Sequence, residues 1–462
     1  MNKNSNLYIL AQYLTAILLV VAIPSYSESA VECDAPREVC DWRAKIVGLK
    51  TPNMIASGIL IEDGLIVTNR HVVEDHQSIL VKNFYGDIDK GEVVPHDIPV
   101  DLAIVTSGLN KITPDVSKLL AKNQSQTLYV VAFDQGRNAA RVYKPSTFAL
   151  YPKLETHPIA RIHSNSKALP GNSGGAVVDQ YGMLVGVLAS GDHRISEIIP
   201  ATNINKVFGA IGAPYKAVFS QIGGFIRRCA DALHASASIL KNPPDPIISK
   251  LERNCLRSKN KQLIDQAGQT FGRWWMFELS EKFLRKSEQF DPGSPNTLMS
   301  LAVTYHLSRK PEFTIDILKR YLELDPSNHQ ALRMSIQSAG MVGDKAFADK
   351  VLNLMERHNP SALPLAKSYI ENAFSNSRLK SSLGSGIQPN RTGVDPLLIA
   401  LDFKKSIMSA VFASTFFFKN LAARAATLGA AKLDPLAVVK TPRWSKTSTC
   451  SAGTIRSTET LP

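Results

Sequence analysis

The chain has 462 residues, of which 44% are hydrophobic, and its formal net charge is +13. This length exceeds what one hydrophobic core usually supports, so we expect two or three domains. Residues 376–462 contain 12 Lys or Arg and 4 Asp or Glu, a net +8, which leaves only +5 for the rest of the chain. Because most of the excess charge lies in this tail, we expect no nucleic-acid partner.

The first 27 residues have the pattern of an export signal. Lys3 supplies a positive start, residues 8–23 are uncharged and mainly apolar, and Ser25 and Ser27 place small residues before a cleavage site after Ser27. The alternative is a retained membrane anchor, but this apolar stretch is shorter than the roughly 20 residues that cross a bilayer. We therefore expect a periplasmic or secreted protein.

Five cysteines in an exported chain indicate an oxidising compartment. Cys33 and Cys40 would close a short loop, worth about 2.5 kcal/mol by chain-entropy reasoning. Cys229 and Cys255 form a candidate second pair, which leaves Cys450 free or intermolecular, and the pairing stays open at this stage. No spacing resembles paired Cys-x-x-Cys, so we expect no metal and no other cofactor.

Residues 45–207 have the pattern of an all-β region. Short β-branched or apolar runs, such as 59–61, 65–68, 128–133 and 183–189, are separated by Gly, Asp and Asn turns. Runs of this length with frequent turn signals predict an all-β domain of two small antiparallel barrels. We assign this domain to residues 28–215.

Helical periodicity begins after Pro214. The segment Lys-Asn-Pro-Pro-Asp-Pro at 241–246 cannot continue a helix, so we expect residues 216–257 to be a helical linker. The fold class is therefore multidomain, with an all-β double barrel followed by an all-α region of helical repeats.

A repeat of 34 residues marks 258–375, since three dipeptides recur at this spacing: Asp291-Pro292, Asp325-Pro326 and Asn359-Pro360. This period is the length of a helix-turn-helix repeat. Alignment on the prolines also groups two helix-contact positions, occupied by Gly268, Ala302 and Ile336 and, three residues later, by Phe271, Tyr305 and Ala339.

The pattern resembles the tetratricopeptide family over residues 261–363. Its better matches are Leu298, Ala302, Tyr305, Ala348 and the three prolines. The bulky Ile336 departs from the family pattern, as expected if the third repeat is a degenerate cap. The alternative is a plain helical bundle with accidental spacing.

Residues 376–462 are rich in Ser, Gly, Thr and Lys, and we expect a basic tail that is largely disordered. An apolar stretch at 406–418 is flanked by lysines and is too short to span a membrane. A membrane-surface helix, a helix docked on the repeats and no stable structure remain three open interpretations.

The strongest chemical motif is Pro-Gly-Asn-Ser-Gly-Gly at 170–175, which contains Ser173. A serine hydroxyl is a poor nucleophile unless a base removes its proton. His71 ends an upstream strand-like run, and Asp101 begins another. We predict that Ser173 is the nucleophile, that His71 is its base and that Asp101 orients the base. The backbone N–H groups of Gly171 and Ser173 are the expected oxyanion hole.

These segments resemble trypsin-like serine proteases, most of all the bacterial HtrA/Deg branch. The resemblance implies a serine endopeptidase that acts on protein or peptide substrates. Assembly of the chain into a homo-oligomer through the repeats, which would gate access to the site, is a further open interpretation. No PDZ module follows; the helical repeats stand in its place and are expected to bind a substrate or a protein partner. The alternative is an inactive protease-like domain that serves a binding scaffold.

Chain order separates this interpretation from the α/β-hydrolase elbow, which Gly171, Ser173 and Gly175 also match. In a hydrolase the acid and the histidine follow the serine, whereas here both precede it. Asp97 competes with Asp101 for the acid role but lies just before a proline, outside a strand. Other histidines, His76, His96 and His163, are expected to be structural.

Lys45-Ile46-Val47-Gly48 resembles a trypsinogen activation site, but Asn172 stands where an Asp would pair with the freed Ile amine. A neutral amide cannot form that ion pair, so we expect an enzyme that needs no cleavage before Ile46. The substrate-binding residues are expected to be Lys167, Leu169, Ala189, Ser190 and Gly191. The segments that hold them contain no acidic residue, which favours a modest apolar side chain at the substrate's P1 position.

Overall fold

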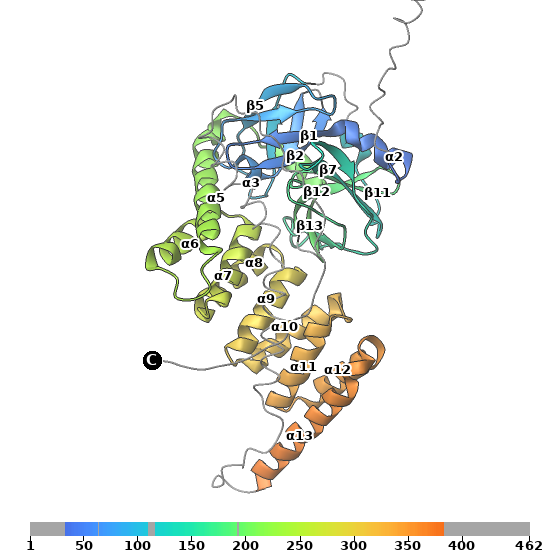
Figure 1. The fold of residues 1–462 in the computed structure, drawn as a ribbon, viewed down its shortest axis with the longest axis vertical. Helices are drawn as coiled ribbons and strands as arrows, with labels where there is room; N and C mark the ends of the chain where they lie inside the picture. Colours follow the sequence, from blue (N-terminus) through green and yellow to red (C-terminus); the bar gives the residue numbers. More distant parts are fainter. Residues whose placement is uncertain (1–32, 63, 110–115, 192–193, 383–462) are drawn as a thin grey trace, which may run out of the picture.

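The computed structural model describes residues 33–62, 64–109, 116–191 and 194–382. The expected export signal, the position of Cys450 and nearly all of the expected tail lie outside these ranges. A β-rich part is followed by a column of helices that extends away from it (Figure 1). None of the described helices has the length and apolar character needed to span a membrane.

The first sheet is a closed antiparallel barrel with the strand order β1-β2-β3-β6-β5-β4. Its strands are β1 (Ile46–Lys50), β2 (Ile55–Glu62), β3 (Leu65–Thr68), β4 (Ser78–Lys82), β5 (Ile88–Val94) and β6 (Ala103–Thr106). In β4, buried Ile79 and Val81 flank exposed Leu80, as expected for a strand with one face toward the core. The short helix α3 (Arg70–Val73) follows β3 directly.

The second sheet has seven antiparallel strands in the order β8-β7-β11-β12-β13-β10-β9. They are β7 (Leu128–Asp134), β8 (Ala139–Val142), β9 (Ala149–Leu150), β10 (Ile162–Ser164), β11 (Ala176–Asp179), β12 (Leu184–Gly191) and β13 (Ser196–Pro200). One apolar core, with Ile59 and Val67 from the barrel and Val131 and Val187 from this sheet, joins the two. The all-β prediction is confirmed, with the second unit a half-barrel.

Short helices border the β-rich part. Before it lie α2 (Arg37–Cys40) and a 3-10 turn (Asp41–Lys45), and the Cys33–Cys40 disulfide closes this segment with an S–S distance of 2.00 Å. Within and after it lie 3-10 turns at Val116–Leu119 and Ala213–Tyr215 and the helix α4 (Thr202–Phe208). The first expected cysteine pair is thus confirmed.

The helical part comprises nine long helices in the described residues. They are α5 (Lys216–Ser236), α6 (Asp245–Arg257), α7 (Lys261–Arg273), α8 (Phe277–Phe290), α9 (Pro295–Leu307), α10 (Pro311–Leu324), α11 (His329–Val342), α12 (Lys345–His358) and, after a 3-10 turn at Pro360–Ala362, α13 (Leu363–Ser382). The first helices of three successive pairs, α7, α9 and α11, begin 34 residues apart, and so do their partners α8, α10 and α12.

The same spacing governs the helix caps. The side chains of Asn260, Ser294 and Asn328 accept hydrogen bonds from the first turns of α7, α9 and α11. Gly268 is small for a packing reason, because an added Cβ would lie 2.7 Å from Leu284 Cγ in the paired helix. The predicted 34-residue period is therefore present as three helix pairs.

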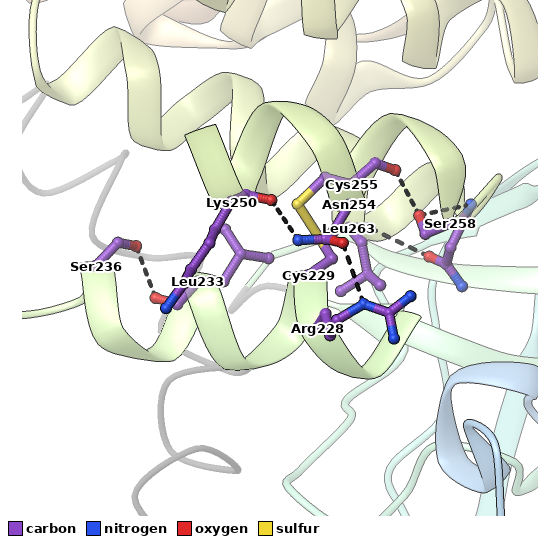
Figure 2. Close-up of a disulfide and its surroundings, with 10 residues drawn as sticks. Arg228, Cys229, Leu233, Ser236, Lys250, Asn254, Cys255, Ser258 and Leu263 are labelled. Atoms are coloured by element: carbon purple, nitrogen blue, oxygen red, sulfur yellow. Dashed lines mark hydrogen bonds between the residues drawn. A yellow bond between two sulfur atoms is a disulfide. The ribbon is translucent and has the colours of Figure 1, made fainter. Parts of the chain in front are cut away.

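The segment 216–257 is helical, as expected, but it is not a spacer. The disulfide Cys229–Cys255 joins α5 to α6 with an S–S distance of 2.03 Å and a Cα–Cα distance of 4.8 Å (Figure 2). Buried Leu251 of α6 shares one core with Phe271 of α7 and Phe283 of α8. The linker interpretation was wrong because the Pro-rich segment 241–246 is a turn between two helices of the same domain.

Candidate active site

His71 and Asp101 are brought together by the pairing of β3 with β6. Thr68 at the end of β3 lies opposite Ala103 at the start of β6, so the residues just beyond these ends are neighbours. His71 Nδ1 lies 2.8 Å from Asp101 Oδ2, and the His71 backbone N–H donates to Asp101 Oδ1 at 3.0 Å. The Arg70 N–H donates to the Asp101 carbonyl at 3.1 Å. The carboxylate is thus held in register with the imidazole.

The Asp101 carboxyl is buried with its partners. Burial by itself would raise the pKa of Asp101, but the charge and hydrogen bonds of His71, together with the charge of Arg161, hold the pKa below its usual range. The group is therefore an anion at neutral pH. This is the state needed to orient an imidazole through Nδ1 and to stabilise its protonated form.

Ser173 lies in a tight turn between the two sheets. Its carbonyl accepts a hydrogen bond from the Ser57 N–H of β2 at 2.8 Å, and its hydroxyl donates to the Ala189 carbonyl of β12 at 3.2 Å. Gly174 has a φ of +85°, and an added Cβ would lie 2.0 Å from the Ser57 carbonyl oxygen and 2.4 Å from Thr68 Oγ1. Only glycine permits this approach, which sets the serine turn against the end of β3, three residues before His71.

The Asn172 side chain stabilises the serine turn through hydrogen bonds to neighbouring segments. Its side chain is fully buried. Its Oδ1 accepts from the Leu169 N–H at 2.6 Å, while Nδ2 donates to the Phe133 carbonyl at 3.1 Å and to Tyr143 Oη at 3.0 Å. Ile46 begins β1 and is buried. A neutral amide therefore provides the support that an ion pair to a freed amine would otherwise supply.

Gly171 and Ser173, the expected oxyanion donors, flank Asn172. Gly171 has a φ of +93°, and its carbonyl accepts from Ser57 Oγ at 2.7 Å, so its peptide orientation is fixed. Among the described residues, the N–H groups of Gly171 and Ser173 have no acceptor. Two unpaired backbone donors beside a serine hydroxyl are the arrangement that an oxyanion hole requires.

The other Asp and His residues considered in the sequence are not part of the His71–Asp101 contact. Asp97 is exposed and is not in contact with His71, so the structure favours Asp101 as the acid. His96 is buried, and its Nε2 lies 2.9 Å from the Leu102 carbonyl; burial lowers its pKa to about 4. His163 is buried against Asp291, at 2.8 Å.

Helix α5 supports the His71 side of the site. The buried Arg70 guanidinium donates to the Glu74 and Phe219 carbonyls and lies 3.5 Å from the centre of the Phe219 ring. Burial lowers the pKa of Arg70 to about 9. At Gly223, an added Cβ would lie 2.1 Å from the Glu74 carbonyl oxygen. The helix backbone thus packs directly against the turn that follows His71.

The predicted substrate-binding residues occupy two segments. Lys167 is exposed and Leu169 is half-buried, both ahead of the serine turn. Ala189, Ser190 and Gly191 end β12, where Ala189 is buried and the other two are half-buried. The exposure of Lys167 shows that this side chain is directed outward.

An unexpected acidic residue lies opposite these positions. Ser190 of β12 pairs with Glu197 of β13, and Ser190 Oγ donates to Glu197 Oε2 at 3.2 Å. The same carboxylate oxygen accepts from Arg161 Nη1 at 2.7 Å, while Arg161 Nη2 lies 3.5 Å from Asp101 Oδ2. One buried guanidinium therefore links the carboxylate beside His71 to the strand that carries the predicted substrate-binding residues.

The helical domain completes this cluster. Lys261, the first residue of α7, donates to Glu197 Oε1 at 2.6 Å and to Ser294 Oγ at 2.9 Å. Its ammonium also lies 2.8 Å from Asp265 Oδ2. Asp101, Arg161, Glu197, Lys261 and Asp265 thus form a row of alternating charges, which we call the buried charge row.

A second contact reinforces the junction. Asp291 Oδ2, in the turn between α8 and α9, lies 2.8 Å from His163 Nε2 and accepts from the Arg161 N–H at 3.3 Å. The equivalent Asp325, one repeat later, instead accepts from Ser327 and Asn328 within its own turn. Only the first repeat therefore uses this acidic turn residue to contact the β-rich part.

Opposite charges offset burial at Arg161, Glu197 and Lys261, whereas burial prevails at Asp265 and raises the pKa of its carboxyl. Burial would raise the pKa of Glu197, but Lys261 and Arg161 hold it well below its usual range. Burial would lower the pKa values of Lys261 and Arg161, but their acidic neighbours raise both. Removing one partner of such a buried pair typically costs about 3–5 kcal/mol, since it leaves an uncompensated charge.

Sequence reasoning missed these supporting residues. Arg161, Glu197 and Lys261 carry no motif, and charged residues are usually read as solvated surface groups. Asp291 was interpreted only as a turn residue of the repeat, and His163 only as structural. The one available signal was that His163 and Glu197 lie within short strands and that Lys261 begins a helix.

The fold and the site define a class: a trypsin-like peptidase domain followed by a helical region. Residues 56–187 match the family model for the trypsin-like peptidase domain. The matched stretch includes all three predicted catalytic residues.

Two curated relatives are serine endoproteases DegS. That of Salmonella typhimurium is 24% identical over 137 residues, covering 29% of this chain and 38% of the relative. That of Haemophilus influenzae is 27% identical over 144 residues, covering 29% of this chain and 41% of the relative. The chain thus spans about two fifths of the length of these relatives.

Solved structures are also similar to part of the chain. The inactive form of the Rv3671c protease is 19% identical, with a TM-score of 0.33, and the match covers 40% of this chain and 100% of that one. A serine endoprotease from Yersinia pestis is 22% identical, with a TM-score of 0.31, covering 37% of this chain and 64% of that one.

Proposed function

We propose that the chain is a serine endopeptidase that hydrolyses peptide bonds through Ser173, His71 and Asp101. The observation that carries the proposal is the 2.8 Å contact between His71 Nδ1 and buried Asp101, beside a serine turn packed on the same strand end. The match to the trypsin-like peptidase domain supports the same assignment.

The proposed chemistry is that of a Ser-His-Asp triad, in which the Ser173 hydroxyl gives its proton to His71 instead of donating to the Ala189 carbonyl. His71 Nε2 takes the Ser173 proton as Oγ attacks the substrate carbonyl carbon, and the N–H groups of Gly171 and Ser173 stabilise the oxyanion. The C–N bond then breaks, and His71 gives its proton to the departing amine. Water hydrolyses the acyl-enzyme by the same route in reverse, with His71 again as base.

The test compares wild-type protein with Ser173→Ala and, as a matched control, Ser327→Ala on unfolded casein. Ser327 is exposed in the helical region. We expect cleavage by the wild type and the control and at least a 10³-fold loss in Ser173→Ala, because the nucleophile is absent. N-terminal sequencing of the active protein should show an intact Lys45–Ile46 bond. Equal cleavage by all three proteins would refute the proposal.

The second candidate is a binding scaffold with an inactive peptidase domain. The helical pairs that replace a PDZ module favour a binding role, and we propose that they capture protein substrates or a partner. A fluorophosphonate probe separates the two candidates, because it attaches to Ser173 only if His71 activates the hydroxyl. Failure to label Ser173 in folded protein would favour the scaffold.

The compartment is part of the same proposal. Two disulfides, Cys33–Cys40 and Cys229–Cys255, are those of a protein that folds in an oxidising environment. We therefore propose a periplasmic or secreted enzyme, with the export signal in residues 1–27.

A further inference from the structure

We propose that Arg161 is a positioning residue for Asp101 and that the helical domain holds Arg161 in place through Lys261. The inference rests on the proposed function, because it concerns the carboxylate that orients His71. It assigns the helical domain a direct part in the active site, in addition to any binding role.

Arg161 is placed to act on Asp101 alone among the catalytic residues. Its guanidinium side chain is only 4% exposed and has three oxygen neighbours: Asp101 Oδ2 at 3.5 Å, Glu197 Oε2 at 2.7 Å and Ser190 Oγ at 3.4 Å. Each terminal nitrogen serves a different carboxylate. Because guanidinium is planar and rigid, a shift toward one carboxylate moves it away from the other.

Because Lys261 occupies one carboxylate oxygen of Glu197, only the other oxygen is left for Arg161. Oε1 accepts from Lys261 at 2.6 Å, and Oε2 accepts from Arg161 at 2.7 Å, so each oxygen has its own cation. The Lys261 and Glu197 side chains are 5% and 3% exposed, and among the described residues the one further donor to Oε1 is the neutral Asn296 amide at 3.5 Å. Without the Lys261 charge, Glu197 would draw both ends of the guanidinium and withdraw Nη2 from Asp101.

Lys261 is itself fixed by the helical fold. It begins α7, lies 2.8 Å from Asp265 one turn later and donates to Ser294, the cap of α9. The position of its ammonium therefore depends on two helices of the repeat region. Loss of this packing would reach Asp101 through three ion pairs: Lys261 to Glu197, Glu197 to Arg161 and Arg161 to Asp101.

From the buried charge row we predict the direction in which each substitution shifts the pH dependence of activity. Asp101 contacts the His71 imidazole and Arg161 contacts the same carboxylate oxygen of Asp101. The next charged or titratable groups are Arg70, Glu197, Lys261, Asp265, Asp291 and His163. Removing a cation favours the protonated imidazole, whereas removing an anion disfavours it. Arg161→Met and Lys261→Met should therefore shift the acidic limb of activity to higher pH, and Glu197→Gln should shift it to lower pH.

The experiment measures the second-order rate of fluorophosphonate attachment to Ser173 between pH 5 and 9, using the full chain. We expect the midpoint of the acidic limb to rise by about one pH unit in Arg161→Met and by about half a unit in Lys261→Met. It should fall by about half a unit in Glu197→Gln. Arg161→Lys keeps the charge and should restore the wild-type midpoint.

The matched control is Lys282→Met, which removes an exposed lysine whose partner is Glu252 at 3.2 Å. Its midpoint should equal that of the wild type. Circular dichroism checks that each variant folds. If Arg161→Met does not fold, the opposite midpoint shifts expected for Lys261→Met and Glu197→Gln still test the inference. A slower rate with unshifted midpoints, or midpoint shifts of the same sign, would overturn this inference but leave the proposed function standing. A wild-type chain that is not labelled would refute the proposed function and the inference together.

Discussion

The helical domain supports the two halves of the candidate site by different physical means. Behind His71, helix α5 contributes mainly close packing, with the Gly223 backbone against Glu74 and the Phe219 ring against Arg70, besides a partly exposed ion pair between Arg227 and Asp75 at 2.7 Å. Behind Asp101, helix α7 contributes Lys261 to the buried charge row. Close packing depends on shape and hardly on pH, whereas a buried charge row depends on every member being present and ionised.

This difference suggests two roles. The α5 contact fixes where the base lies, and the charge row fixes both the position and the electrostatic environment of the acid. A substitution in the α5 contact should change the free energy of unfolding without changing its dependence on pH. A substitution in the buried charge row should also alter how stability or reactivity varies with pH.

The largest expected effect is that of Asp101→Asn. We expect the rate of Ser173 labelling to fall about 10⁴-fold with the fold intact, because an amide favours the wrong imidazole tautomer. Asp97→Asn is the matched control and should retain the wild-type rate. A loss near tenfold in Asp101→Asn would instead return the acid role to Asp97.

The charge side is tested next by Asp291→Asn, with Asp325→Asn as the control one repeat later. Burial would raise the pKa of Asp291, but His163 and Lys261 hold it below its ordinary value of 3.8. Its contribution to stability is therefore present above pH 3.8 and is lost as the pH falls through the depressed value. Urea unfolding should show a loss of about 3 kcal/mol at pH 7 that shrinks below pH 3.8. A loss independent of pH would contradict this prediction.

The smallest effect is expected on the packing side. Gly223→Ala places a methyl group against the Glu74 carbonyl and should cost about 2 kcal/mol in urea unfolding, equally at pH 5 and 7. Gly224→Ala is the neighbouring control, since its added Cβ would approach only the flexible end of Arg228, at 3.0 Å. In a helix this control should be neutral or stabilising by up to about 1 kcal/mol. Equal losses in the two variants would show that α5 does not support the His71 turn.

Much of the fold could be predicted because its signals are local. Short apolar runs with turn residues indicated the β-rich part, and recurring Asp-Pro or Asn-Pro dipeptides indicated helix pairs that begin 34 residues apart. The linker prediction failed for a non-local reason. A Pro-rich turn looks the same whether it separates two domains or joins two helices of one core, and the packing of Leu251 on Phe271 decided between them.

By itself, the sequence determined the candidate nucleophile, base and acid, because each lies in a short motif whose order along the chain excludes the nearest imitator. It also offered the two disulfides as candidate pairs and showed that Asn172 stands where an Asp would form an ion pair. Only the tertiary structure showed that Arg161, Glu197 and Lys261 meet behind Asp101. The physical reason is that the effect of a charge depends on its burial and its neighbours, and these neighbours are 36 and 64 residues apart along the chain.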